Sequence, residues 1–390
     1  MSLLDRLRGP ASLVTLTASY MRRASLREIA TGARIAVEIG RRVRHAPILR
    51  PNRELLARPD DLAPVCTLVS DTHLCVDGSV PVELPLDPGQ WPYHELPSAA
   101  EIADGLRRIL AHIRVHAAHT VLWCGDEVDS GDAAEWASWR SVVESVPGLA
   151  HRLVPGNHDI CFNRPFDEDS TLARRAVRER AYQEHAGRLA DFPIVDTIIT
   201  DVGPANVVLL DSCRHRSTHV LSNAVGKCGD DQLDELARLL STMQGPLLVV
   251  MHHHPWRDES FLEPDAWYNT AVDADRLTAL LGAYRRRGRA NQVMVCHGHR
   301  HAMTAGNVGH PSGEIAIVGL PSSTLGDKSV TGQLDARLRY GVAGLRRDGS
   351  WGLALHDVGP LVQPRKLNQH SPSLPPGPSL RALSALAFVP

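Results

Sequence analysis

Aspartate, asparagine and histidine occur in short clusters along this sequence, and each cluster directly follows an apolar run. After "CTLVS" come Asp71 and His73, and after "TVLWC" comes "GDEVDSGD", which contains Asp126. Alternate residues of an extended segment point to the same side, so a carboxylate and an imidazole spaced in this way can share a cation. Gly125 allows a sharp turn, and the two oxygens of Asp126 can bridge two cations. Taken alone, such carboxylates can equally cap a turn or a helix.

A third cluster, "GNHD" at residues 156–159, follows "HRLVP". The amide oxygen of Asn157 is a neutral ligand for a hard cation. His158 stands beside Asp159, and a carboxylate in that position can orient an imidazole. Four residues of these types in a row at the end of a strand rarely serve packing, so a functional interpretation is favoured.

Two further clusters are rich in histidine, of which the chain holds 20. "VVMHHHPW" (249–256) places three consecutive imidazoles at the end of an apolar run. "HGHRH" (297–301) places His299 and His301 at alternate positions, with Gly298 giving room for the backbone. Two imidazoles on one side of a segment form a metal-ligand pair. His297 is better explained as a structural residue.

These clusters must be held by the elements that precede them. From about residue 61, short apolar runs alternate with helical stretches such as 98–116, where Ser98 and Glu101 predict a capping box, and 230–243. Apolar strands bounded by helices are typical of an α/β domain whose sheets are covered on both faces. Ligands of such sheets bind beyond the carboxyl ends of the strands, which is where all five clusters lie.

Composition and charge narrow the class of protein. The chain is 43% hydrophobic and 22% charged, as folded proteins are. Its net charge of −2 combines +7 over residues 1–60 with −9 over the remainder, which argues against general nucleic-acid binding. The 7 cysteines are scattered and predict a reducing compartment. Without a long apolar run or a secretion signal, we expect a cytoplasmic protein.

Three parts are expected along the chain. Residues 1–60 form a basic helical segment, residues 61–358 the α/β domain, and residues 359–390 a Pro/Ser-rich tail. The N-terminal segment has two interpretations. It is either a helix packed on the main domain or an amphipathic segment that makes a peripheral contact with an anionic membrane surface or a protein partner.

Taken together and in this order, the five clusters resemble the calcineurin-like metallophosphoesterase family. The resemblance covers roughly residues 64–325, and every block is complete. It implies that the α/β domain is a calcineurin-like four-layer α/β/β/α sandwich with two mixed β-sheets and a dimetal site at strand-end loops. It also implies that the protein hydrolyses phosphoesters.

The resemblance implies a role for each matching residue. One ion would be held by Asp71, His73 and His301, the other by Asn157, His253 and His299, with Asp126 bridging the two. Ligands of these types suit Mn, Fe, Zn or Co. Two such ions about 3.5–4 Å apart can acidify a bridging water to hydroxide and clamp the phosphate oxygens.

His158 and Asp159 are the expected catalytic residues. His158, aimed by Asp159, would stabilise developing charge or protonate the leaving oxygen. For "HHHP" (252–255) the resemblance implies that the metal ligand is the first histidine of the His-His-Pro block, His253. Alternation along the strand then turns His252 and His254 to the opposite side, although a bend at the following proline can bring His254 toward the substrate.

Differences between this sequence and other branches of the family indicate the class of substrate. Ser130 and Asp159 stand where Ser/Thr protein phosphatases carry Arg and Glu. The chain looks more like class III cyclic-nucleotide phosphodiesterases and glycerophosphodiesterases, through its His-His-Pro block and "VGLPSSTLGD". We therefore expect a phosphodiesterase for a small nucleotide-like or glycerol-type substrate, with Arg164 and Arg214 as candidate phosphate-binding side chains. The alternatives are a phosphomonoesterase or pyrophosphohydrolase for nucleotide-sugar or lipid-linked substrates, and a non-catalytic scaffold.

Overall fold

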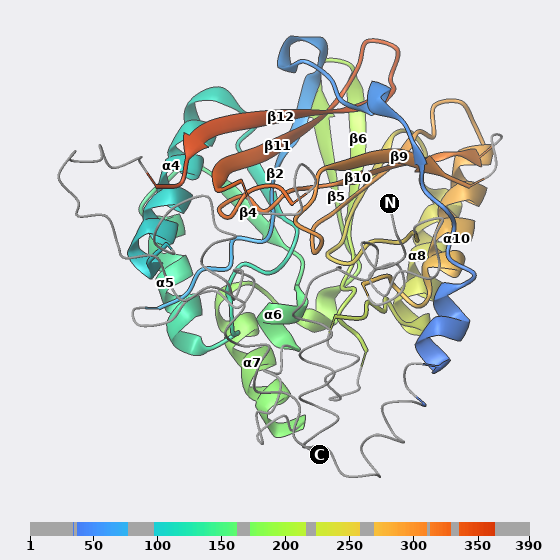
Figure 1. Ribbon diagram of the computed structural model, residues 1–390. Coiled ribbons are helices and arrows are strands. Elements are labelled where there is room, and N and C mark those ends of the chain that lie inside the picture. The colour runs from blue at the N-terminus through green and yellow to red at the C-terminus, as the bar shows by residue number, and fades with distance from the viewer. Residues whose placement is uncertain are drawn as a thin grey trace, which may run out of the picture.

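The computed structural model of the chain describes residues 34, 37–76, 97–161, 172–215, 224–257, 269–309, 313–328 and 335–362. Arg164, most of the basic N-terminal segment and the tail from residue 363 lie outside the described residues. The described residues form two β-sheets packed face to face, with helices on the outer faces (Figure 1). None of the helices in these ranges is both long and apolar enough to cross a bilayer.

The smaller sheet carries the first three clusters. Its strands are, in spatial order, β12 (Trp351–Pro360), β11 (Arg337–Leu345), β2 (Ala63–Val69), β3 (Thr120–Trp123) and β4 (Ala150–Leu153). β2, β3 and β4 run parallel, while β11 pairs antiparallel with both β2 and β12. Because parallel strands end at the same edge of a sheet, the loops after β2, β3 and β4 meet there.

The larger sheet carries the two histidine clusters. Its strands are, in spatial order, β1 (Arg50–Pro51), β9 (Thr304–Val308), β10 (Ile315–Gly319), β8 (Val293–His297), β7 (Leu247–Val250), β6 (Gly203–Leu209) and β5 (Ile194–Thr200). β6, β7, β8 and β10 are parallel to one another, and β1, β5 and β9 pair antiparallel. Val250 at the end of β7 lies opposite Cys296 of β8, so both histidine clusters emerge side by side.

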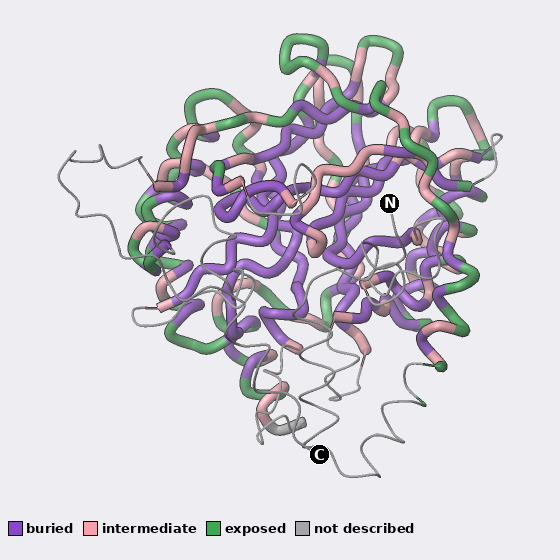
Figure 2. Tube along the Cα trace, viewed as in Figure 1, coloured by how far each residue is buried: buried purple, intermediate pink, exposed green. Residues whose placement is uncertain are grey.

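Helices complete four layers. The longer ones are α4 (Ala99–His116), α5 (Ala133–Glu144), α7 (Leu172–His185), α8 (Asp230–Thr242) and α10 (Ala274–Arg286). The short ones are η1 (Arg53–Leu55), η2 (Pro59–Asp61), α6 (Asn157–Ile160) and η4 (Leu189–Asp191). α4 and α5 pack on the smaller sheet, with α7 against α5, and α8 and α10 pack on the larger sheet. Figure 2 shows the buried residues concentrated along the strands. The predicted α/β/β/α sandwich is confirmed.

α4 begins where the sequence predicts. The Ser98 hydroxyl accepts a hydrogen bond from the Glu101 N–H at 3.2 Å, and the Glu101 carboxylate accepts one from the Ser98 N–H at 2.8 Å. The predicted capping box is therefore confirmed. The buried face of the helix contains the apolar residues at helical spacing Ile102, Leu106, Ile109 and Ile113.

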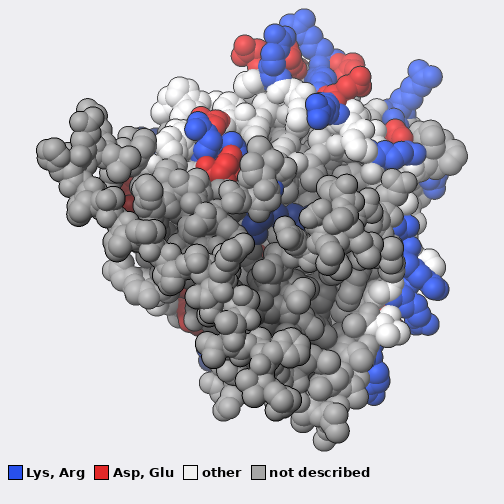
Figure 3. Space-filling model, in the orientation of Figure 1, with Lys and Arg blue, Asp and Glu red and all other residues white. Residues whose placement is uncertain are grey.

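The described part of the N-terminal segment packs on the domain. Residues 37–43 are helical, and Ile39 and Val43 are buried against Val225 and Val272. β1 adds an edge strand to the larger sheet through its pairing with β9. Lys and Arg side chains gather along the right edge of Figure 3, where Figure 1 places this helix and α10. At the other end, Leu361 is still buried in the core, just past the predicted domain limit.

Candidate metal centre

The first group of candidate ligands joins loops from both sheets. Asp71 and His73 follow β2, His301 follows β8, and one ligand atom from each lies within 4.8 Å of the others. The Nε2 atoms of His73 and His301 are 2.9 Å apart, and His301 Nε2 is 3.4 Å from Asp71 Oδ1. All three side chains are buried. The residues that the sequence assigned to one ion thus come together.

Asp126 lies between this group and the histidines that follow β7. Its ligand atom lies within 4.8 Å of those of Asp71 and His252, and its Oδ2 is 3.1 Å from His252 Nε2. Its Oδ1 accepts a hydrogen bond from the His158 N–H at 2.8 Å. Burial raises the pKa of this carboxyl, but His252 and His158 outweigh burial and hold the pKa well below its usual value. An ionised carboxylate in this position has the arrangement of a bridging ligand.

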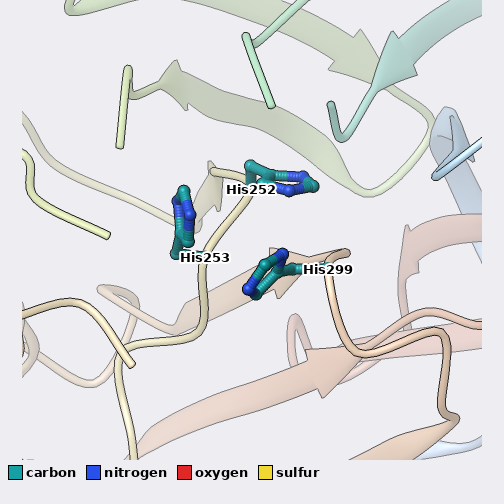
Figure 4. A group of neighbouring side chains, drawn as sticks. All are labelled: His252, His253 and His299. Atoms are coloured by element: carbon teal, nitrogen blue, oxygen red, sulfur yellow. The ribbon is translucent and has the colours of Figure 1, made fainter. Parts of the chain in front are cut away.

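A further group contains three histidines, His252, His253 and His299, whose rings are close together in Figure 4. The His253 and His299 ring centroids are 4.6 Å apart, and His252 lies 4.9 Å from each of the other two. Asn157 joins the group, because its Oδ1 is 3.0 Å from His252 Nε2. The predicted ligands of the second ion therefore lie in one place, with His252 among them.

The expectation that strand alternation turns His252 away from the site is wrong. β7 ends at Val250, and the chain bends at residues 252 and 253, so the two-residue period of a strand does not extend to them. His252 and His253 both lie against His299 as a result. The sequence pattern contains the apolar run but no signal for the residue at which its pairing stops.

His254 lies in a separate aromatic cluster. Its ring is buried, 4.8 Å from Trp256 and 5.7 Å from His297 between ring centroids. Burial lowers the pKa of His254 well below its usual value, and His297 adds to this effect. Contact between His254 and a substrate stays a prediction.

The hydrogen bonds of His252 leave one nitrogen lone pair facing oxygen atoms. Its Nδ1 donates to the Cys124 carbonyl at 2.9 Å, so Nε2 faces Asp126 and Asn157. Burial lowers the pKa of His252, but the Asp126 carboxylate outweighs burial and raises it to about 9. A nitrogen lone pair beside two acceptor oxygens requires a proton or a metal ion between them.

His253 also has a ring nitrogen that is available to a metal ion. Its Nδ1 hydrogen-bonds to Ser212 Oγ at 2.9 Å, and Ser212 Oγ also accepts from the His253 N–H at 3.1 Å. Its Nε2 is buried without a hydrogen-bond partner within the described structure. An orphaned imidazole nitrogen, oriented through its other nitrogen, is what a metal ligand offers. The donor set therefore fits two transition-metal ions.

Asp159 does not orient His158 as the sequence suggested. Its carboxylate accepts hydrogen bonds at 2.8–3.1 Å from the backbone N–H groups of Gly156, Asp126, Glu127 and Val128. Burial and the nearby Asp126 raise the pKa of Asp159 to about 7. Asp159 thereby joins α6 to the loop after β3. His158 is held by another residue, because its Nδ1 donates to the Asp129 carbonyl at 2.8 Å.

Asp129 is a further site residue, which the sequence did not single out. Its carbonyl holds His158, and its Oδ1 is 3.3 Å from His73 Nδ1. The available signal was its place in the same cluster as Asp126, "GDEVDSGD". Ser212, which orients His253, had no such signal, because nothing local marks a serine that contacts a loop 41 residues away.

Strained backbone is concentrated at this site. Six non-glycine residues of the described chain have positive φ, and all but Ala336 are candidate ligands: Asp71, His73, Asp126, His299 and His301, with φ from 45° to 71°. Gly125 has φ of +90°, and a Cβ there would lie 2.6 Å from His252 Nδ1. Such conformations cluster where function requires a particular side-chain direction.

A cavity of about 910 Å³ lies beside the centre. Ile160, which follows Asp159, and Lys227 both line it. Lys227 follows Gly226, where a Cβ would come within 2.5 Å of the His253 Cβ. The walls contain both basic and acidic side chains. The helix at residues 37–43 contributes Glu38 and Arg42. The other charged side chains named here are Arg175, Glu179, Asp211, Arg214 and Asp231.

Arg214, a predicted phosphate contact, lines this cavity and is already paired with carboxylates. Its Nη1 is 2.9 Å from Asp231 Oδ2, and its Nε is 3.3 Å from Asp211 Oδ2. Its side chain is only 19% exposed. A phosphate would have to compete with two acidic groups, so the role of Arg214 in binding stays a prediction.

Comparisons with known proteins agree with this geometry. A family model of calcineurin-like phosphoesterases matches residues 66–303. No curated protein matches the chain in sequence at a significant level. Similar solved structures include a dimetal phosphatase from Danio rerio, with 15% identity, 77% of this chain and 98% of that chain covered, and a TM-score of 0.45. They also include a purple acid phosphatase from yellow lupin (Lupinus luteus) seeds, with 9% identity, 75% and 51% covered, and a TM-score of 0.48.

The family match spans more than half of the chain and contains every candidate ligand described above. The fold agrees with it, because two mixed sheets with outer helices bring the five clusters to one place. The protein therefore belongs to the calcineurin-like phosphoesterase family and is a metal-dependent phosphoester hydrolase.

Proposed function

We propose that this hydrolase is a phosphodiesterase for a small nucleotide-like or glycerol-type substrate. The cavity of about 910 Å³ beside the metal centre carries the proposal, because it has room for an organic group on the far side of the scissile phosphate. Its mixed charged walls suit a polar group such as a sugar, a base or glycerol. The His-His-Pro block, which the chain shares with phosphodiesterases of this kind, supports the same choice.

The ligands divide between the two ions as follows. We assign Asp71, His73 and His301 to one ion, Asn157, His253 and His299 to the other, His252 to the second ion as well, and Asp126 to both. Two ions of Mn, Fe, Zn or Co at these positions would lower the pKa of a shared water and neutralise the phosphate oxygens. The buried loops keep bulk water away from these polar groups.

His158 supplies the proton for the leaving oxygen in this proposal. The Asp129 carbonyl accepts from its Nδ1 at 2.8 Å, and Asp129 Oδ1 lies 3.8 Å from the same nitrogen. Because Nδ1 is held by the Asp129 carbonyl, Nε2 is the ring nitrogen left to give a proton to the departing alkoxide. Asp159 has a different role, as the residue that fixes the loop on which Asp126 stands.

A hydrolysis panel tests the substrate class. Purified protein loaded separately with Mn²⁺, Fe²⁺, Zn²⁺ and Co²⁺ would be assayed with bis-p-nitrophenyl phosphate, p-nitrophenyl phosphate, cyclic nucleotides, glycerophosphodiesters and nucleotide-sugar pyrophosphates. We expect kcat/KM for the preferred diester to exceed that for p-nitrophenyl phosphate by about 10-fold or more. A preference for monoesters or pyrophosphates would overturn the diesterase assignment. Loss of all activity with every metal would favour a scaffold.

The bridging role of Asp126 is tested by Asp126→Asn. The amide keeps the shape but loses the charge that both ions share, so turnover should fall by about 100-fold or more and bound metal should decrease. Asp132→Asn is the matched control, because Asp132 precedes α5 and its side chain makes no capping hydrogen bond there. Equal activity of Asp126→Asn and the parent enzyme would contradict the assignment.

We also propose a cytoplasmic location, supported by the seven cysteines, all of which are described and present as thiols. The packing of residues 37–60 on the domain favours a structural role for the described part of the basic segment. Sedimentation with anionic liposomes, comparing the full chain with a form that begins at residue 37, tests whether the segment also binds membranes. Binding that is lost in the shorter form would establish the peripheral contact.

A further inference from the structure

Two cysteines that are not metal ligands, Cys161 and Cys213, are in contact with each other. Cys161 directly follows α6, and Cys213 lies in the loop after β6. Cys161 Sγ is 3.5 Å from the Cys213 carbonyl oxygen, and the two side chains hydrogen-bond to each other. The Cys213 thiol is also 3.3 Å from the Pro155 carbonyl. Two segments distant in the sequence thus bring a pair of thiols together.

A fixed positive charge lies against one member of the pair. Arg175 Nη1 is 3.2 Å from Cys161 Sγ. The same guanidinium donates to the carbonyls of Cys213 and His215 at 2.8 and 2.7 Å and pairs with Glu179 at 2.7 Å. These bonds hold the guanidinium against the sulfur. A cation in contact with a cysteine favours the thiolate, which is the nucleophilic form.

The two thiols differ in acidity and exposure. The hydrogen bond from Cys213 lowers the pKa of Cys161 against the effect of burial, and Arg175 lowers it further. Burial raises the pKa of Cys213 well above its usual value, and this residue is 1% exposed, whereas Cys161 is partly exposed. Burial raises the pKa of four other cysteines as well: Cys66, Cys124, Cys228 and Cys296. A cysteine whose pKa is lowered, beside one whose pKa is raised, is the arrangement of an attacking and a resolving cysteine.

We propose that Cys161 and Cys213 form a modification site at which hydrogen peroxide produces a reversible disulfide. The Cys161 thiolate attacks one peroxide oxygen, the O–O bond breaks, and hydroxide leaves to be protonated by solvent, which gives a sulfenic acid. The Cys213 sulfur then attacks the Cys161 sulfur. The S–O bond breaks, and the departing hydroxide takes the Cys213 proton to form water. The two thiols supply the two electrons that reduce the peroxide.

The disulfide would affect the metal centre through both loops that it joins. α6 carries Asn157 and His158, and Ser212, the neighbour of Cys213, orients His253. Pulling the two loops together changes the position of ligands to the second ion. Oxidised protein is therefore expected to hold its metal less tightly and to recover after treatment with dithiothreitol.

Peptide mass spectrometry tests the modification directly. The full, metal-loaded chain would be treated with hydrogen peroxide, alkylated and digested without reduction. We expect a linked peptide pair joining Cys161 to Cys213 that disappears in Cys161→Ser. In Cys213→Ser the sulfenic acid should persist on Cys161 and react with dimedone. Cys228→Ser, a change at a buried cysteine outside the pair, should leave the linked peptides unchanged. Absence of the link in the parent protein would overturn the proposal.

The pH dependence of alkylation provides a second test that needs no crosslink. The rate at which iodoacetamide labels Cys161 should reach half its maximum below pH 8.5, the ordinary value for a cysteine. In Cys213→Ala, which removes the hydrogen-bond donor, the midpoint should move upward. A midpoint at or above the ordinary value in the parent protein would contradict an activated Cys161. Both experiments measure reactions of the cysteine side chains and not hydrolysis. A negative result in either can therefore be distinguished from a failure of the proposed hydrolase activity.

Discussion

At the scale of single residues, the metal centre consists of side chains held in unfavourable backbone states. Each left-handed conformation at Asp71, His73 and the other ligands costs about 1–2 kcal/mol. Nearby hydrogen bonds oppose this cost, since Ser322 Oγ donates to the Asp71 carbonyl at 2.6 Å and Thr324 Oγ1 to the Thr72 carbonyl at 2.7 Å. These hydrogen bonds help to hold the ligand residues in the directions that the centre requires.

Single alanine substitutions rank the three consecutive histidines. His252→Ala should weaken metal binding by about 10-fold or more, because it removes the imidazole between Asp126 and Asn157. His253→Ala should have a similar effect, whereas His254→Ala should leave bound metal unchanged. Metal content after dialysis, measured by mass spectrometry, checks the ranking. Full metal content in His252→Ala would return this residue to a structural role.

Residue types and spacing predicted where ligands would gather but not every contact between them. Asp71, His73 and His301 were recognisable because Asp-x-His and His-x-His spacing is local. Whether His252 faces the centre depends on where β7 ends, and the partner of His158 depends on how the loop after β3 folds against α6. Both depend on contacts between segments far apart in the sequence, which no local pattern contains.

At the scale of elements, the strands position the loops that carry the candidate ligands, and the turn after β10 holds one of these loops in place. The turn after β10 packs on the loop after β2, where Ser323 Oγ accepts from the Ser70 N–H at 3.0 Å and the Ser323 N–H donates to the Ser70 carbonyl at 2.8 Å. The sequence predicted the strands that precede the five clusters from their apolar runs. It did not predict their spatial order, in which antiparallel β9 lies beyond β10, because pairing partners far apart in the chain leave no periodic signal.

β4, at the edge of the smaller sheet, carries a histidine that makes stability depend on pH. His151 Nδ1 accepts a hydrogen bond from Trp123 Nε1 at 3.1 Å, and burial lowers the pKa of His151 to about 4. Between pH 6.5 and about 4 the unfolded chain binds a proton here that the folded chain does not, so this contribution to stability is lost as pH falls through that window.

Urea unfolding at pH 7.5 and pH 5.5 measures this contribution. The parent protein should lose about 1 kcal/mol more of its unfolding free energy over that interval than His151→Gln, which cannot titrate. The comparison cancels the titration of groups that the two proteins share. An equal loss in both proteins would contradict a neutral buried His151.

At the scale of the whole molecule, the metal centre joins the two sheets. Asp71, Asp126 and Asn157 follow strands of the smaller sheet, while His253 and His299 follow strands of the larger one. Between the sheets lies an apolar core that contains residues of both. Ions held by these residues would lie on the seam between the two halves of the sandwich, and each would contribute to holding the halves together.

Removal of the ions should lower thermal stability. An ion that binds only the folded state, at a concentration of about 1,000 times its Kd, adds about 4 kcal/mol, so EDTA should lower Tm by about 5 °C for each ion removed. Differential scanning calorimetry with and without chelator measures the effect. Asp126→Asn, which is expected to hold less metal, should respond much less to EDTA. A parent Tm that does not change with chelator would show that the seam is stable without ions.

The N-terminal helix has a consequence for how such an enzyme can diversify. Glu38, Ile39 and Arg42 line the cavity, and none of them is a member of the candidate ligand groups found in the described chain. Mutation at these positions can reshape the room for a substrate without touching the residues that perform hydrolysis. Substitutions in this short surface helix can therefore change the preferred substrate during evolution, while separate selection preserves the catalytic loops.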